Sequence, residues 1–196
     1  DLLPADKLYE TLLTQAAKAD KDAGGLLNYS CLSGEHITKV KDGRPLFVRA
    51  PHSRFNLPNF MLTQLYAAFA SLKIGTDILV KEEGVKTDVM VAQGGLFRTP
   101  VIGQQVLADV LETPITIMDT AGEGGPWGMA VLAVYALQKT GQSLADFLDK
   151  TVFADVKSTT RKPSPEGIAG CRQFIGRYRS GLAVEIGAGS AVADLD

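Results

Sequence analysis

A glycine pair near the middle of the chain is the feature of this sequence best suited to holding a ligand. Gly94 and Gly95 follow an apolar run at 88–92, which we predict to be a strand, and precede a predicted helix at 100–111 with Thr99 as its N-cap. Glycines lack a Cβ atom, so a flat ligand or a phosphate can approach the backbone closely, and a helix start offers unpaired N–H groups. The unit therefore predicts a nucleotide-binding turn. A tight turn without a ligand is the alternative, because neither of the glycine patterns GxxxxGK and GxGxxG is present.

A second glycine-rich turn spans 120–130, between a predicted strand at 114–118 and a predicted helix at 127–139. Gly125 and Gly128 leave one face of the helix start without bulky side chains, which suits either a ligand or a closely packed neighbouring helix. In open α/β sheets, ligands bind beyond the carboxyl ends of the strands. Two such turns, each following a strand, therefore strengthen the interpretation as a ligand site.

Helices and strands alternate along the chain around these turns. We therefore expect an α/β domain with parallel strands among helices, one long irregular segment and a tail that frays. Three strands are few for so many helices, so we expect part of the sheet to lie outside this sequence. The periodicity predicts helices at 5–22, 58–83, 100–111, 127–139, 144–149 and 166–180, strands at 26–32, 88–92 and 114–118, the irregular segment at 33–56 and the tail at 187–196.

Composition and charge narrow the class of protein. The 196 residues carry a net charge of −2 with both signs interspersed, so we expect neither nucleic acid nor a membrane surface as a partner. No apolar run approaches the roughly 20 residues that span a bilayer, and no signal peptide is visible. Cys31 and Cys171 have no ligand-spaced partner, so we expect free thiols in the cytoplasm and no metal site, with a single disulfide as the alternative. Because the chain starts at Asp1 and not at Met, we expect part of a longer protein.

Taken together, the motifs of this chain resemble the C-terminal domain of the FGGY family of carbohydrate kinases. The resemblance covers roughly residues 25–140, extends more loosely to the last helix, and is most similar to the xylulokinases of that family. No single motif is specific, but their order is. The motifs are Ser33-Gly34-Glu35, His52 and Arg54 before the long helix, Gly94-Gly95, Ala108-Asp109-Val110, Pro114-Ile115, Glu123-Gly124 and Gly128-Met129-Ala130.

The resemblance implies an actin-like ATPase fold of the ribonuclease H-like type, with a small mixed or parallel sheet and the active site in a cleft between two domains. Residues 1–196 would form the C-terminal nucleotide-binding domain without its first strands. The cofactor would be ATP or ADP, with Mg²⁺ in the intact enzyme. The adenosine end would lie against Gly94, Gly95, Leu96 and Thr99.

The same resemblance places catalysis outside this chain. The family's N-terminal domain supplies the catalytic aspartate, the sugar pocket and a phosphate-binding loop, and no segment of this sequence matches them. We therefore expect no catalytic residue here and no kinase activity of the chain alone. A pentose, ketose or related polyol would be bound through the N-terminal domain, and a homodimer is compatible with the resemblance. Two alternatives stay open: a non-catalytic actin-like module that binds nucleotide or protein, and an unrelated α/β domain with purely structural glycine turns.

Several polar residues are expected to have structural roles. Glu35 is expected to pin the backbone of its own loop, and Asp109 to bond a helix end. The basic residues Arg172, Arg177 and Arg179 spread over more than one face of the last predicted helix, so we expect them to be solvated.

Overall fold

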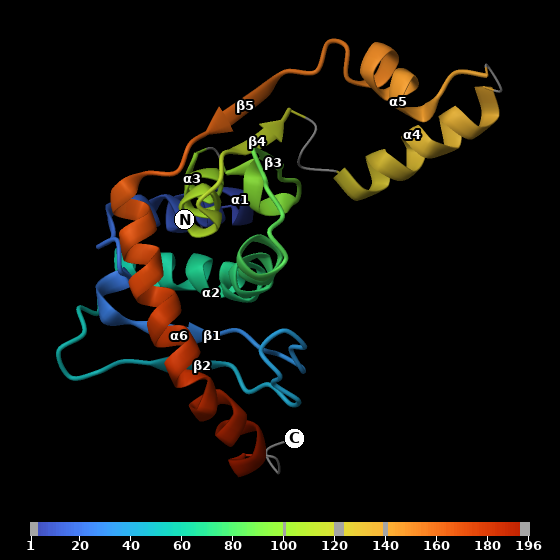
Figure 1. The fold of residues 1–196 in the computed structure, drawn as a ribbon. Coiled ribbons are helices and arrows are strands. Elements are labelled where there is room, and N and C mark those ends of the chain that lie inside the picture. The colour runs from blue at the N-terminus through green and yellow to red at the C-terminus, as the bar shows by residue number, and fades with distance from the viewer. Residues whose placement is uncertain (1–3, 100, 120–123, 139–140, 193–196) are drawn as a thin grey trace.

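Four helices form the body of the chain in the computed structural model, which describes residues 4–99, 101–119, 124–138 and 141–192. The central helix, α2 (Leu57–Asp77), contacts α1 (Ala5–Gln15), α3 (Ile102–Leu111) and α6 (Pro165–Ala191) (Figure 1). Apolar side chains recur along α2 at helical spacing and are buried on the faces toward these neighbours. The long helix predicted at 58–83 is confirmed.

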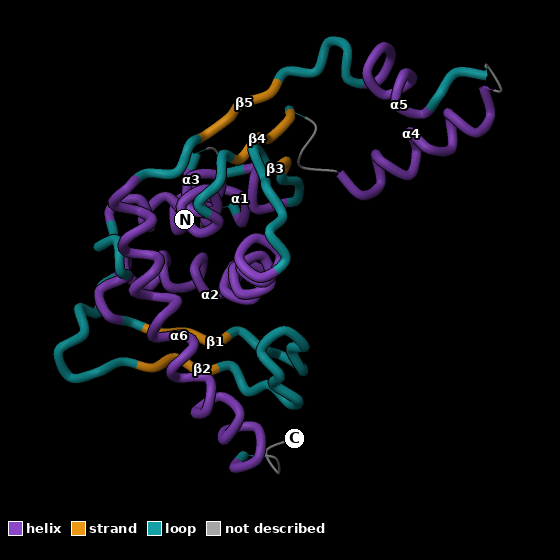
Figure 2. The backbone as a smooth tube through the Cα atoms, in the orientation of Figure 1, coloured by secondary structure: helices purple, strands orange, loops and turns teal. Residues whose placement is uncertain are grey.

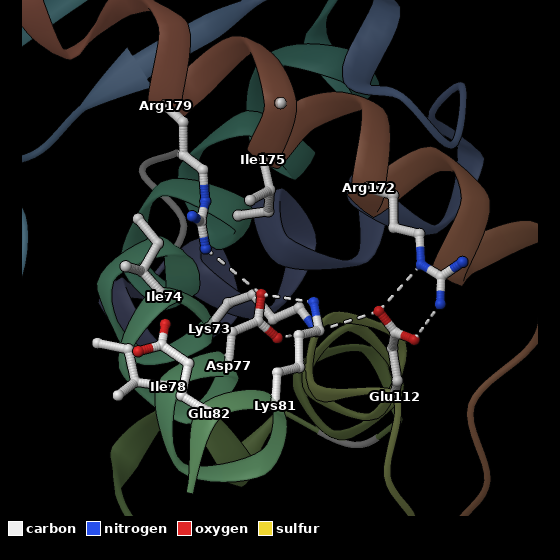
Figure 3. A pocket seen from close by; sticks show the side chains of 11 residues that line it. Lys73, Ile74, Asp77, Ile78, Lys81, Glu82, Glu112, Arg172, Ile175 and Arg179 are labelled. Atoms are coloured by element: carbon white, nitrogen blue, oxygen red, sulfur yellow. Dashed lines mark hydrogen bonds and ion pairs between the residues drawn. The ribbon is translucent and has the colours of Figure 1, made fainter.

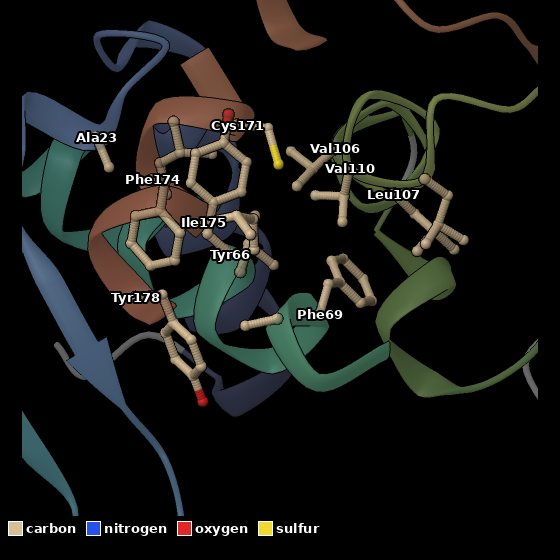
Figure 4. Close-up of a cluster of buried hydrophobic side chains, with 14 of the residues drawn as sticks. Ala23, Tyr66, Phe69, Val106, Leu107, Val110, Cys171, Phe174, Ile175 and Tyr178 are labelled. Carbon is tan, nitrogen blue, oxygen red and sulfur yellow. The ribbon is translucent and has the colours of Figure 1, made fainter. Parts of the chain in front are cut away.

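The hydrophobic core lies where α2, α3 and α6 meet (Figure 4). The ring of Tyr66 from α2 packs against that of Phe174 from α6, with their centroids 5.0 Å apart. Val110 of α3 is fully buried beside them, and Cys171 is a buried free thiol, as is Cys31. The prediction of two unbridged cysteines is therefore confirmed.

The strands form two small sheets (Figure 2). In the first, β1 (Leu27–Tyr29) pairs antiparallel with β2 (Leu46–Val48). In the second, the order is β3 (Met90–Val91), β4 (Ile115–Met118) and β5 (Ser158–Arg161), with β3 parallel and β5 antiparallel to β4. The second sheet is therefore mixed. The expectation of parallel strands holds only for β3 and β4, and both β2, inside the segment predicted to be irregular, and β5 were missed.

Residues next to the helix ends explain where α2 begins and ends, but they do not explain every helix end. The Asn56 side chain caps α2, and a π turn (Ile78–Glu82) with Gly84 at a φ of +67° ends it. The N-cap role predicted for Thr99 is wrong, because Thr99 ends a 3₁₀ turn (Gly95–Arg98) and the N-cap position of α3 is Val101, without a side-chain cap. The first predicted helix ends early, at a 3₁₀ turn (Ala16–Lys18).

Helix α6 is much longer than the predicted helix at 166–180, and it continues to Ala191, into the tail that the sequence predicted to fray. Tertiary contacts with the loop before β2 hold its last turns. A Glu185 carboxylate oxygen accepts a hydrogen bond from the Arg44 backbone N–H at 2.9 Å, and a Cβ on Gly189 would lie 2.3 Å from the Asp42 carbonyl. Residues 193–196, the rest of the predicted tail, lie outside the described residues.

Helices α4 (Gly124–Gln138) and α5 (Leu144–Phe147) lie away from the body of the chain (Figure 1). Helix α4 contains no charged residue and no buried one, and Met129 and Leu137 are 70% and 80% exposed. A π turn (Leu148–Val152) and β5 lead back toward α6. Among the described residues, no helix combines the length and apolarity that crossing a membrane requires.

Candidate functional site

The two glycine turns lie at the same edge of the mixed sheet. Strands β3 and β4 are parallel neighbours, with Met90 opposite Ile115, so their carboxyl ends point the same way. The chain leaves β3 through Gln93–Gly95, and after β4 it enters α4 at Gly124. We call these two segments, Gln93–Gly95 and the first turn and a half of α4, the glycine edge. Their placement at neighbouring carboxyl ends confirms the arrangement predicted from the sequence, apart from residues 120–123, which lie outside the described part.

The backbone of the glycine edge is open. A Cβ atom on Gly94 or Gly95 would meet no heavy atom within 4 Å, and the same holds for Gly125 and Gly128. Gly94 also has a φ of +126°, which side-chain-bearing residues rarely adopt. No packing within the described residues explains these glycines. For Gly125 and Gly128, the interpretation as tight helix packing therefore finds no neighbour among the described residues.

Glycines elsewhere in the chain are of two kinds: Gly84, Gly141, Gly176 and Gly187 also face open space, whereas others have an evident packing reason. A Cβ on Gly43 would lie 2.1 Å from the Cys31 carbonyl oxygen, and one on Gly170 would lie 2.1 Å from the Lys21 carbonyl oxygen. These positions need glycine because backbones approach each other there. The glycine edge differs from them in having free space in front of its backbone.

The other two predicted site residues face the protein interior. Leu96 packs against the core and against α3, where a Cβ on Gly103 would lie 3.2 Å from the Leu96 Cγ. Thr99 is buried, at the end of the 3₁₀ turn that starts at Gly95. The structure thus brings all four predicted residues together within one short segment, with the two glycines as its open part.

One residue of the glycine edge was not singled out from the sequence. A Cβ on Gly124 would lie 2.0 Å from Oε1 of Gln93 and 3.0 Å from its Cβ, so the Gln93 side chain lies against the first residue of α4. The sequence signal was the glycine itself at the start of the second turn. Nothing in the sequence paired it with Gln93.

The structural roles expected for Glu35 and Asp109 are confirmed. The Glu35 carboxylate accepts hydrogen bonds from the backbone N–H groups of Ile37 and Thr38, at 3.1 and 2.6 Å, and so holds its own loop. Asp109 accepts a hydrogen bond of 2.7 Å from the backbone N–H of Ser164, the N-cap residue of α6. Both carboxylates are therefore engaged in positioning backbone.

A hollow of about 520 Å³ between α2, α3 and α6 holds a dense set of charges (Figure 3). Lys73, whose side chain is only 7% exposed, lies 3.0 Å from both Asp77 and Glu112. Two further cations pair with Asp77: Arg179 from α6 and Lys81 from the π turn. Arg172 donates two hydrogen bonds to the Glu112 carboxylate. We call this set the charged hollow: Lys73, Asp77, Lys81, Glu112, Arg172 and Arg179.

The charges of the hollow neutralise one another and the helix ends around them. Helices α2 and α3 both end there, and a helix C-terminus carries partial negative charge that favours cations. The guanidinium of Arg172 and the ammonium of Lys73 hold the pKa of Glu112 down to about 2. The lysines and arginines are thus engaged by carboxylates and helix ends, which disfavours a further anion in the hollow.

The basic residues of α6 are therefore not simply solvated, as the sequence had indicated. Arg172 pairs with Glu112, Arg179 with Asp77 at 3.4 Å, and Arg177 with Asp22 at 3.5 Å. These pairs join α6 to three other parts of the chain. The side chains of Arg172 and Arg179 are 66% and 49% exposed, so each of these two pairs is expected to contribute little on its own.

Solved structures of sugar and polyol kinases share this fold. The chain is similar to xylulose kinase from Lactobacillus acidophilus (TM-score 0.67, 22% identity, covering 90% of this chain and 35% of that one). It is also similar to gluconate kinase from the same organism (TM-score 0.69, 22% identity, covering 94% of this chain and 37% of that one). A third similar structure is glycerol kinase from Plasmodium falciparum solved with ADP (TM-score 0.59, 15% identity, covering 95% of this chain and 34% of that one). The chain therefore spans about a third of the length of these proteins. The comparison with curated proteins gives no match.

A family comparison agrees with the structural one. Residues 2–137, which include α1 to α3, the parallel strands and most of α4, match the sequence model of the FGGY family of carbohydrate kinases, C-terminal domain. The expected fold, α/β of the actin-like ATPase type with a small mixed sheet, is confirmed by the similarity to these kinases and by the order of β3, β4 and β5. The chain belongs to the FGGY family of carbohydrate kinases, whose C-terminal domain it contains.

Proposed function

We propose that this chain is the C-terminal ATP-binding part of a sugar kinase, and that the glycine edge receives the adenosine end of the nucleotide. The observation that supports this most directly is the open backbone at Gly94 and Gly95, which no packing requirement explains. A turn of this kind at the carboxyl end of a parallel strand suits a flat ligand. The solved relative with ADP is a member of the same fold.

In this proposal the chain's own residues bind and orient the nucleotide. Gly94 and Gly95 present backbone to the adenosine, while Leu96 and the buried Thr99, which the sequence had also assigned to the site, support the turn from the interior side. ATP supplies the γ-phosphoryl group, and Mg²⁺ neutralises its oxygens in the intact enzyme. Metal ligands, phosphate loops and the catalytic base come from the part of the enzyme outside this sequence, so the chain alone has no kinase activity.

We also propose that the domain is completed by strands outside this sequence. The related structures are about two and a half times as long as the chain, and the mixed sheet has three strands among the described residues. The exposed apolar side chains of α4 support the same proposal, because a helix that is apolar on all sides is normally buried.

The acceptor in this proposal is a hydroxyl of a pentose, a ketose or a related polyol. The names of the similar structures, which include xylulose, gluconate and glycerol kinases, support this class. The sugar is bound through the N-terminal part of the enzyme. We propose the cytoplasm as the location, since both cysteines are free thiols.

The test is calorimetry of ADP binding to the full-length enzyme with Gly95→Trp. The indole fills the space in front of the turn, so ADP affinity should fall by about 100-fold or more, as expected when a bulky group occupies a ligand's position. The unfolding midpoint should stay nearly unchanged, because a Cβ at Gly95 meets no heavy atom of the described chain within 4 Å. Unchanged ADP affinity in a folded variant would remove Gly95 from the nucleotide site.

A further inference from the structure

The contact between Gln93 and Gly124 joins the two halves of the glycine edge. Gln93 immediately precedes the glycine pair after β3, whereas Gly124 is the first residue of α4 after β4. A Cβ on Gly124 would lie 2.0 Å from Oε1, 2.7 Å from Cδ and 3.0 Å from Cβ of Gln93. The whole length of the glutamine side chain therefore lies against the backbone where α4 begins.

The neighbouring glycines of α4 show that this fit is specific to one position. A Cβ on Gly125 or Gly128 would meet no heavy atom within 4 Å. None of these three glycines has a positive φ, so backbone conformation does not require glycine at any of them. Gly124 differs only in the side chain that lies against it.

The other recorded side-chain contacts of α4 stay within its own part of the chain. The Trp127 ring contacts Phe153, and the Tyr135 ring contacts Phe147, both on the segment that follows α4. The Tyr135 hydroxyl donates to the carbonyl of Gln142, also on that segment. Gln93, in contrast, reaches the start of α4 from the carboxyl end of β3.

We propose that Gln93 is a positioning residue of the nucleotide site, which sets the spacing between the Gly94–Gly95 turn and the first turn of α4. This inference rests on the proposed function, in which both turns contact the same nucleotide. Gln93 is bonded directly to Gly94, and its Cβ, unlike Oε1 and Cδ, cannot turn away, so a methyl group 3.0 Å from this Cβ moves the glycine pair relative to α4. A site built from two turns binds a rigid ligand only when their separation fits it.

The test compares alanine at Gly124 with alanine at Gly125 in the full-length enzyme. Gly124→Ala places a methyl group against Gln93, and the dissociation constant for ADP should rise about tenfold. Gly125→Ala adds the same methyl group one residue later, into open space, and should change it less than about twofold. The KM for ATP should follow the same order in steady-state assays, with kcat changing less than KM because the sugar site is untouched.

Two variants of Gln93 show whether the effect passes through that side chain. Gln93→Gly removes the whole side chain, Cβ included, and should raise the dissociation constant for ADP about threefold. In the double variant Gln93→Gly/Gly124→Ala the methyl group no longer collides, so ADP affinity should return to that of Gln93→Gly. Recovery in the double variant at an unchanged unfolding midpoint is the result that a merely structural role would not give.

The inference is overturned if Gly124→Ala and Gly125→Ala have equal effects, or if the double variant binds ADP as weakly as Gly124→Ala alone. Failure here is distinguishable from failure of the proposed function. If Gly95→Trp abolishes ADP binding while all Gln93 and Gly124 variants bind normally, the nucleotide site stands and the positioning role falls. If Gly95→Trp also binds ADP normally, the site itself is wrong.

Discussion

The charged hollow and the glycine edge are opposites in composition and in packing. In the hollow, six charged side chains lie between three helices, and Lys73 is almost fully enclosed by its carboxylate partners. At the glycine edge, the backbone of Gly94 and Gly95 faces free space and carries no side chain at all. The charges have their partners inside the chain, whereas Gly94 and Gly95 have no packing neighbour in the part of the chain that the structure describes. We therefore interpret the hollow as a structural clamp and the edge as the surface left for a ligand.

The largest effect that tests this comparison is expected from removing Lys73, the central cation of the hollow. Lys73→Met leaves Asp77 and Glu112 without the ammonium they share, so the free energy of unfolding should fall by about 3 kcal/mol, the scale seen when one partner of a buried ion pair is removed. The affinity for ADP should not change, because the hollow is not part of the glycine edge. Chemical denaturation and calorimetry of the folded variant measure the two quantities.

The matched control for Lys73 is Lys81, on the same side of the hollow. Its ammonium lies 3.1 Å from Asp77, but its side chain is 65% exposed. Lys81→Met should therefore cost less than about 1 kcal/mol. If Lys73→Met weakened ADP binding and left stability intact, the hollow would be a ligand site, and the contrast with the glycine edge would be lost.

Acid titration of stability gives a second, smaller effect. The pKa of Glu112 is lowered to about 2 in the folded chain, from an ordinary value of 4.5 without these partners. The unfolded state therefore binds the proton more tightly. The pairs of Glu112 therefore stabilise the fold fully above pH 4.5 and lose that contribution as the pH falls toward 2. After allowance for its partial exposure, we expect about 2 kcal/mol. Glu112→Gln should remove this part of the pH dependence in denaturation curves measured between pH 5 and 2.

Glu185 provides an internal comparison with the opposite sign. It is fully buried, one of its oxygens has no hydrogen-bond partner in the described chain, and burial raises its pKa. The folded state therefore binds this proton more tightly, and stability falls as the pH rises above 4.5. Glu185→Gln should reduce this fall of stability above pH 4.5 and leave the pH dependence of stability below pH 4.5 unchanged. A change on the acid side would mean that the two carboxylates are not independent.

Local sequence patterns predicted the elements of the glycine edge, but they did not predict contacts between residues far apart in the sequence. The apolar runs before Gly94 and Gly124 and the helices after them are signals within a few residues, and the structure has each of them. The strand β5 reads Ser-Thr-Thr-Arg, which carries no apolar alternation, and it forms because β4 offers it a backbone edge. The charged hollow joins Lys73 to Glu112 across 39 positions, a separation that no helical or strand period encodes.

The smallest predicted effect comes from the glycine edge and has the opposite sign to those of the hollow. Gly128 is inside α4, has no positive φ, and a Cβ there meets nothing within 4 Å. Gly128→Ala should therefore stabilise the chain by about 0.5–1 kcal/mol through helix propensity alone. The reverse change at the exposed Ala130 should cost a similar amount and serves as the matched control. If Gly128→Ala instead destabilises the full-length enzyme but not this chain, a segment outside this sequence packs on Gly128, and the openness of α4 belongs to the isolated chain. If it stabilises both, the space before Gly128 stays open in the whole enzyme.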